Sequence, residues 1–206
     1  MINASSSGNS FEIVNAGTYV ARCYSMVHIG TISQDYMGEE KEVNKVRISW
    51  ELPTELKVFK EENGEQPFSV SKDFTLSMHE KANLRKFLES WRGKGFSEDE
   101  AKLFDITKLL GKPCMLSVIH KTSKQGKTYA EISSASALPK GLDCPAQIND
   151  NFEFTYTPFD QSKFEKLPEW LRDKIKTSAE YREAVDPSHK VTKESLQVAD
   201  NEDLPF

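Results

Sequence analysis

The sequence predicts a mainly β fold that also contains a few short helices. Three observations support this prediction: segments in which apolar and polar residues alternate, two Ser-x-x-Glu boxes typical of helix starts, and Gly- or Pro-containing breaks between segments. The order is strand, strand, strand, helix and hairpin, followed by a weaker strand and a C-terminal helix. We therefore expect a β domain (11–138), an extension with a strand and a helix (139–185), and disordered ends (1–10 and an acidic tail, 186–206).

The composition excludes several classes of protein. The chain is 37% hydrophobic and contains no apolar run long enough for a transmembrane helix, and its N-terminus lacks the basic start and apolar block of a secretory signal. Cys23, Cys114 and Cys144 show no C-x-x-C spacing, which favours free thiols in a reducing cytoplasm. We find no catalytic, metal-binding or phosphate-loop motif, and therefore expect no enzyme activity, cofactor or metal.

The first predicted strand, residues 17–29, carries apolar groups on both faces, so its pattern does not say which face is buried. We place Tyr24, beside Arg22, on the open face. An acidic loop, 30–42, follows.

The second strand, 43–51, directs Val46, Ile48 and Trp50 inward, which leaves Lys45 and Arg47 on an open face.

The third strand, 68–77, follows a second acidic loop, 53–67. Lys72 and Phe74 share one of its faces, and the pattern leaves open whether that face lines a groove or the core.

Two capping boxes mark the predicted helices. The box from Ser77 to Glu80 is expected to start a helix whose apolar stripe ends in Trp91, and the box from Ser97 starts a shorter one. Near the C-terminus, residues 151–156 alternate weakly, which indicates an extra edge strand. Pro168 is suited to the first turn of a last helix, in which we expect Trp170 to pack against the domain.

The clearest pattern is the hairpin at residues 112–134. In its first strand, Cys114, Leu116 and Val118 alternate with Met115, Ser117 and Ile119. Gly126 suits a short loop that needs a positive φ. Tyr129 lies just below a tip crowded with lysines. A cationic tip beside an exposed ring suits a nucleic-acid strand, and it equally suits a solvated edge that resists aggregation.

The net charge of −5 is unusual for a nucleic-acid binder, but it is unevenly distributed. Residues 107–131 contain five lysines and one acid, whereas residues 200–206 contain three acids and no base. A local basic surface is therefore compatible with the acidic total.

The order of elements is that of the OB fold, a five-stranded and partly open Greek-key barrel. The ligand groove of that fold lies on strands two and three and on the loops that join strands one–two and four–five. We therefore predict a groove made of Arg22, Tyr24, Lys45, Arg47, Lys72, Phe74, Lys121, Lys124, Lys127 and Tyr129. Its cations would neutralise phosphates, and Tyr129, Phe74 or Tyr24 would stack on bases.

The chain resembles the phage-encoded single-stranded-DNA-binding proteins of OB fold. The resemblance rests on four ordered segments: GTYVARCY (17–24), VRISWELP (46–53), LSMHEKANLRKFLESWRG (76–93) and HKTSKQGKTYAEISS (120–134). The terminal NEDLPF also resembles the acidic tip of bacterial single-stranded-DNA-binding proteins. The predicted partner-binding residues are Asp200, Glu202, Asp203, Leu204, Pro205 and Phe206.

The resemblance implies sequence-tolerant binding of single-stranded DNA in phage replication, recombination or repair, in the cytoplasm of a bacterial host cell. The tip would recruit replication or recombination proteins. Two alternatives stay open: a protein-interaction adaptor, and an accessory subunit of a nuclease or recombinase on an OB scaffold. The sequence leaves self-association open.

Overall fold

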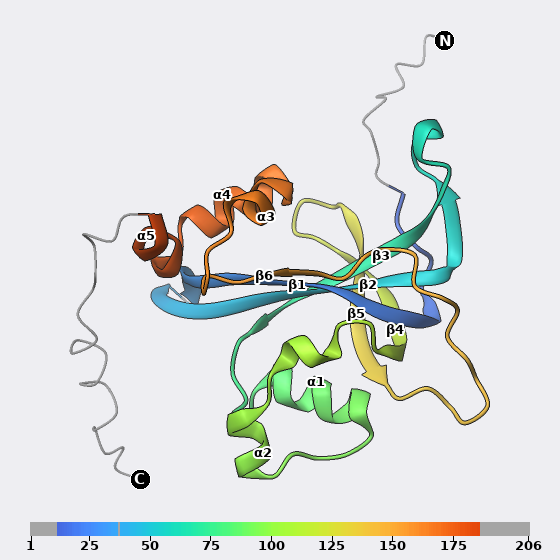
Figure 1. Cartoon of the computed structure of the whole chain (residues 1–206), viewed down its shortest axis with the longest axis horizontal. Helices are drawn as coiled ribbons and strands as arrows, with labels where there is room; N and C mark the ends of the chain where they lie inside the picture. Colours follow the sequence, from blue (N-terminus) through green and yellow to red (C-terminus); the bar gives the residue numbers. More distant parts are fainter. Residues whose placement is uncertain (1–11, 37, 186–206) are drawn as a thin grey trace. The chain divides into compact units, whose positions relative to one another are not determined.

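The computed structural model describes residues 12–36 and 38–185 (Figure 1). The six strands are β1 (Gly17–Tyr36), β2 (Glu39–Val58), β3 (Glu65–Thr75), β4 (Pro113–Thr122), β5 (Thr128–Ser136) and β6 (Phe152–Phe154). The α-helices in the described part are α1 (Asn83–Arg92), α2 (Glu98–Leu103), α3 (Gln161–Lys166), α4 (Glu169–Lys176) and α5 (Ala179–Val185). Short 3₁₀ helices occupy Glu61–Asn63 and Ile106–Leu109. The prediction of a mainly β fold with helices is confirmed.

The strands form one sheet in the order β3-β2-β1-β4-β5, with β6 paired to β1 beside this path. β4 is antiparallel to both of its neighbours, and the register places Leu116 opposite Tyr19 on one side and Ala135 on the other. Within the described residues no ladder joins β3 to β5, so the sheet is open between these two strands.

The chain divides into two compact units, and β1, β2 and β3 each contribute to both. The first unit contains residues 12–25, Ile48–Lys72 and Ser77–Phe152. The second contains Met26–Arg47, Asp73–Leu76 and residues 153–185.

The first unit buries the inward face of its strands against α1. Ile48 and Trp50 are fully buried, as their alternation predicted, and the rings of Trp50 and Trp91 lie 5.8 Å apart. Trp91 is 4% exposed, and its indole N–H donates to the carbonyl of Pro113 at 2.9 Å, which confirms its predicted place in the core.

Helix starts were predicted correctly at one capping box and wrongly at the other. Ser97 accepts from the N–H of Glu100, and the Glu100 carboxylate accepts in return, as a capping box requires. α1, however, begins only at Asn83 and has no side-chain cap. The predicted box fails because Ser77 accepts from the N–H of His79 instead, in a bend that precedes the helix.

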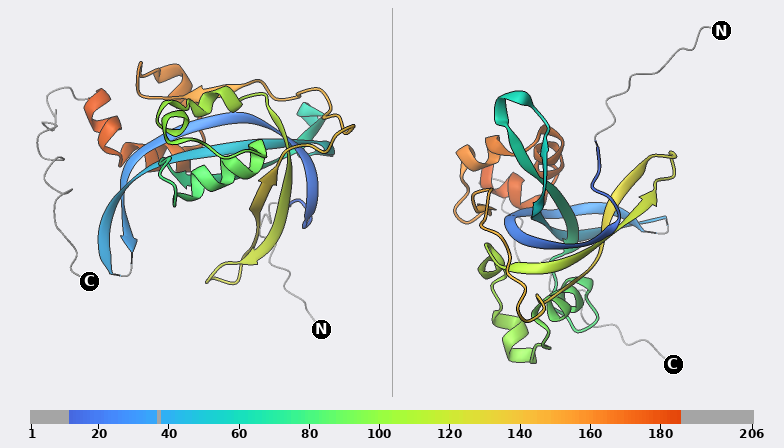
Figure 2. Two further views of the ribbon diagram at one scale, coloured as in Figure 1. Left: turned by 90° about the horizontal axis from the view of Figure 1, so that it is seen from below. Right: turned by 90° about the vertical axis from the view of Figure 1, so that its right-hand side faces the viewer.

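The prediction of a loop at residues 30–42 was wrong, because β1 and β2 continue through most of it and run side by side (Figure 2). The side chains at the far end are exposed and polar, so they carry no alternation that would mark a strand. Hydrogen bonds to α5 hold this part of β1 in place: both the N–H and the hydroxyl of Thr31 donate to the Glu180 carboxylate, at 2.6 and 2.8 Å.

The second unit has an aromatic core of its own. Phe154 of β6 is fully buried, and its ring lies 6.0 Å from that of Phe164 in α3. The hydroxyl of Tyr156 donates to the carbonyl of Ile29 at 2.8 Å. Both C-terminal predictions are confirmed here, because β6 is the extra strand and α4 begins directly after Pro168.

Cys23 and Cys114 are buried free thiols, and Cys144 is partly exposed. Burial raises the pKa of the Cys23 thiol to about 12, so this group stays protonated at neutral pH. The predicted disordered ends (1–10 and 186–206), with the acidic tip at 200–206, lie outside the described residues.

Candidate nucleic-acid interface

The tip of the β4–β5 hairpin is built by a short turn around Ser123. The N–H of Ser123 donates to the carbonyl of Lys127 at 2.9 Å, and the Ser123 hydroxyl accepts from the N–H of Lys127 at 3.1 Å. Gly126 has a φ of +78°, which confirms the predicted loop conformation. In both views of Figure 2 the tip projects clear of α1 and α2.

One face of this hairpin carries a cation, a ring and an acid in contact. Lys121 lies directly opposite Tyr129 in the β4–β5 register, and the Tyr129 side chain is 41% exposed. The Lys121 ammonium donates to the Glu131 carboxylate at 2.9 Å. This hydrogen bond raises the pKa of Lys121 and keeps one lysine beside the ring.

The other two lysines of the tip carry uncompensated charge. Lys124 and Lys127 are exposed, and neither forms an ion pair within the described part of the chain. The tip therefore offers two free cations and an exposed tyrosine ring, which are the groups that a flexible nucleic-acid strand can contact without sequence readout.

At its other end, β5 forms one wall of a basic hollow of about 390 Å³. Lys72 and Lys86 line it together with Asn83, Ser133 and Ser134, and no acid lies among its lining residues. The hollow thus combines positive charge with neutral hydrogen-bonding groups, a composition that suits phosphate oxygens.

Lys72 connects β3 to β5 across the opening of the sheet. Its ammonium donates to the carbonyl of Ile132 at 2.5 Å and lies 5.9 Å from the centre of the Phe87 ring. The predicted groove residue therefore borders the hollow and also bridges the two strands that no ladder joins.

Three predicted groove residues lie in less accessible positions. Phe74 is only 3% exposed, so it cannot stack on a base in this structure. The guanidinium of Arg22 donates to three backbone carbonyls and holds the segment around Pro145 against β1. Tyr24 is half-buried, and its hydroxyl donates to Ser69 at 3.3 Å. We leave Phe74 and Arg22 out of the candidate interface.

Lys45 and Arg47 belong to the second unit, where they surround an acid. Arg47 donates to Asp73 at 2.6 Å, and Lys174 of α4 donates to the other oxygen of the same carboxylate at 2.8 Å. Burial opposes ionisation of Asp73, but the hydrogen bonds and charges of these two cations hold its pKa below the ordinary value. The pKa of Lys45 is lowered by burial and by the positive charge of Lys174, which indicates that several cations gather here.

Trp170 was not among the predicted site residues. We expected it to pack, but its side chain is 52% exposed, and the Arg47 guanidinium lies 4.8 Å from the ring centre. The helical periodicity of the sequence could have indicated this exposure. The buried residues of α4 are Leu171 and Ile175, and Trp170 lies outside the apolar stripe that they form.

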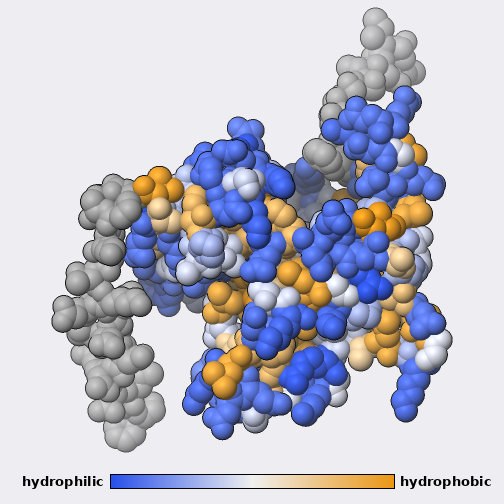
Figure 3. All heavy atoms as spheres, viewed as in Figure 1, coloured by the Kyte–Doolittle hydropathy of each residue, from blue (hydrophilic) through white to orange (hydrophobic). Residues whose placement is uncertain are grey.

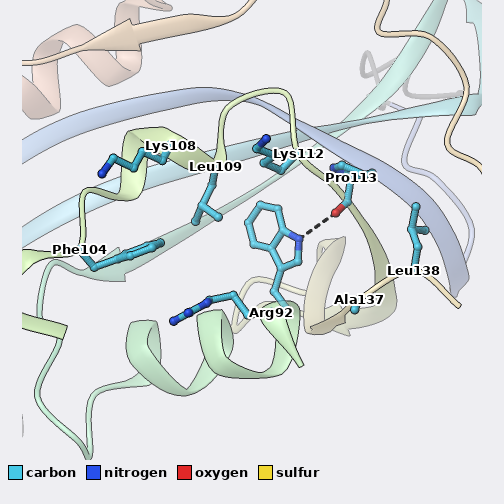
Figure 4. Close-up of a pocket in the computed structure, with 9 residues that line it drawn as sticks. Arg92, Phe104, Lys108, Leu109, Lys112, Pro113, Ala137 and Leu138 are labelled. Atoms are coloured by element: carbon cyan, nitrogen blue, oxygen red, sulfur yellow. Dashed lines mark hydrogen bonds between the residues drawn. The ribbon is translucent and has the colours of Figure 1, made fainter. Parts of the chain in front are cut away.

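The first unit also contains an apolar hollow of about 350 Å³ between α1 and the start of β4 (Figure 4). Trp91, Phe104 and Leu109 supply apolar surface, and Lys108 and Lys112 extend along one side (Figure 4). The Arg92 guanidinium lies 5.6 Å from the Phe104 ring centre, so the hollow combines apolar walls with three cations. This composition suits an apolar group that carries negative charge nearby.

Hydrophilic side chains cover most of the face shown in Figure 3, and the hydrophobic ones are scattered in small groups.

No protein-family model and no curated protein matches this chain. Among the residues that the structure describes, no cluster of His, Cys, Asp or Glu could hold a metal ion, and no helix has the length and apolar character needed to cross a membrane.

Proposed function

We propose that the protein binds single-stranded DNA with little sequence preference, as a non-enzymatic component of phage replication, recombination or repair. One observation carries the proposal: β5 presents the exposed ring of Tyr129, beside the tip lysines, on the same strand that forms a wall of the basic hollow. β5 thus has an aromatic ring near one end and cations near both ends. A strand of DNA could therefore make both stacking and phosphate contacts within the first unit.

The spacing of these features suits an extended ligand. Tyr129 and Ser133 are four residues apart on β5, which corresponds to about 13 Å along the strand. A chain of nucleotides that stacks one base on Tyr129 would follow β5 toward Lys72 and Lys86. The contacting groups are a ring face, ammonium groups and hydroxyls. They would bind the sugar–phosphate backbone and stack on a base without distinguishing one base from another.

We further propose that the sheet is an OB-fold barrel opened between β3 and β5. The strand order and the position of α1 between β3 and β4 support this proposal, since both agree with the OB plan. Lys72 bridges the two open strands. In this fold the four–five loop is a binding element, and here it is the lysine tip.

Fluorescence anisotropy with labelled oligo-dT, at two salt concentrations, tests the proposed function. We expect tight binding that weakens as salt rises, and much weaker binding of duplex DNA of equal length. An oligo-rA probe of the same length compares RNA with DNA. Absence of binding to oligo-dT at low salt would exclude this function.

A second function, that of a protein-interaction adaptor, is favoured by the apolar hollow at Trp91. Its cations and apolar walls would accept an acidic peptide with a large apolar side chain. The terminal segment 200–206 lies outside the described residues, and we propose, from its sequence, that it recruits replication or recombination proteins. An adaptor that does not bind oligo-dT would capture partners and leave the probe free.

A further inference from the structure

Helix α4 has one buried face and one face that carries an exposed indole. Leu171 and Ile175 are 3% and 0% exposed and fix the helix against the second unit. Trp170 and Lys174 are four residues apart, so they lie on one side of the helix, next to the apolar stripe. The buried stripe therefore determines where the indole is presented.

Arg47 of β2 holds this indole in place. Its guanidinium lies 4.8 Å from the Trp170 ring centre and is itself fixed by the 2.6 Å hydrogen bond to Asp73. Because Asp73 also accepts from Lys174, the helix and the two strands are joined through a single carboxylate. The ring is thus oriented before any ligand arrives, which lowers the entropy that binding would cost.

The charges around the ring favour an anion. Lys45, Arg47 and Lys174 supply three positive charges against the single negative charge of Asp73. Of the acids on α4, Asp173 is paired with Lys176 at 3.0 Å, and Glu169 is exposed at the start of the helix. The cluster therefore keeps an excess of positive charge.

The exposure of Trp170 is unusual for this chain. The other two tryptophans, Trp50 and Trp91, are 0% and 4% exposed, whereas more than half of the Trp170 side chain is open to solvent. A tryptophan that only packs would bury most of its large apolar surface. The exposed ring, held by a cation, is instead suited to stacking on a second flat group.

We propose that Trp170, positioned by Arg47, is a second base-stacking site for a nucleic-acid strand, with Lys45 and Lys174 contacting the adjoining phosphates. This inference rests on the proposed binding of single-stranded DNA, and it assigns a DNA contact of its own to the second unit.

Intrinsic fluorescence of the full chain tests the inference, because Trp170 is the exposed tryptophan and the other two are shielded. Titration with unlabelled oligo-dT is expected to quench the emission, and Trp170→Phe should remove most of that quenching. Trp170→Ala should weaken binding of labelled oligo-dT by about 5- to 150-fold. Trp170→Phe keeps a ring for stacking and should lose less affinity than Trp170→Ala.

Tyr36 provides the matched control, since it is a 61% exposed ring with the Lys41 ammonium 5.3 Å from its centre. Its surroundings are acidic, with Asp35, Glu39 and Glu40 close in sequence, so Tyr36→Ala should leave the affinity unchanged. Thermal unfolding of each variant shows whether it is folded.

The outcomes separate the two proposals. Oligo-dT that binds the full chain without quenching, together with wild-type affinity of a folded Trp170→Ala variant, would refute the stacking site and leave the proposed function standing. A full chain that does not bind the probe would refute both. Equal losses of affinity in the Trp170→Ala and Tyr36→Ala variants would also overturn the assignment.

Discussion

Changing Lys124 and Lys127 together to alanine should make DNA binding weaker and less sensitive to salt. Both side chains are exposed and form no ion pair within the described residues, so each is free to neutralise one phosphate. For single strands, each neutralised phosphate contributes about −0.7 to the slope of log K against log salt. Loss of both contacts should therefore reduce the slope by about 1.4.

The same arithmetic gives the loss of affinity. If binding at 1 M salt is unchanged by the two substitutions, a slope smaller by about 1.4 weakens binding about 25-fold at 0.1 M salt. This corresponds to about 1.9 kcal/mol. Lys121→Ala should change the slope by less than about 0.7, because Lys121 is already engaged by Glu131 at 2.9 Å.

Anisotropy of labelled oligo-dT at four or five salt concentrations measures both quantities. The control is the double variant of Lys102 and Lys140, which removes two exposed lysines of the same unit that lie outside the hairpin and form no ion pair within the described residues. It should show nearly the wild-type slope. A slope that is unchanged in the Lys124/Lys127 variant, or reduced equally in the control, would show that the hairpin tip is not the phosphate contact.

Tyr129→Ala should weaken oligonucleotide binding by about 5- to 150-fold while the thermal transition is kept, and wild-type affinity would rule out stacking there. Glu51→Gln should lower the free energy of unfolding by about 2–3 kcal/mol, because the fully buried carboxylate accepts the backbone and side-chain N–H groups of Asn149 at 2.7 Å. A urea unfolding midpoint equal to wild type would contradict this. Removing residues 200–206 should leave DNA binding intact or strengthen it at low salt, and should abolish capture of replication proteins in a pull-down. Phe206→Ala alone should lose most of the capture, and equal recovery from full-length and truncated protein would argue against a docking role.

Local patterns predicted the parts of the fold in which one face of an element is buried. The alternation of Cys114, Leu116 and Val118 is reproduced by their burial in β4, and the positive φ of Gly126 follows from the turn that the sequence indicates. These predictions succeed because burial of a strand face and the geometry of a short turn depend on nearby residues.

The errors have different physical causes. The far end of the β1–β2 hairpin is polar and exposed, so its strands depend on backbone pairing and on contacts such as that of Thr31 with Glu180, 149 positions away. Phe74 is buried on a strand where alternation allowed either face. Trp170 is exposed because it lies beside the buried stripe of α4, and no pattern within α4 shows its contact with Arg47, a residue distant in sequence.

The two units are interleaved along the chain, and this limits how the protein can be divided. Each unit is assembled from three separate segments, so no single cut yields either one intact. A fragment ending after residue 138 would keep Met26–Arg47 but lose Phe154 and Tyr156, which pack on that part of the hairpin. Its uncovered strands would then present unpaired apolar surface to other copies. Exchange of one intact unit with a related gene would therefore require a crossover at every boundary between the segments, so that all three segments of that unit come from the same parent.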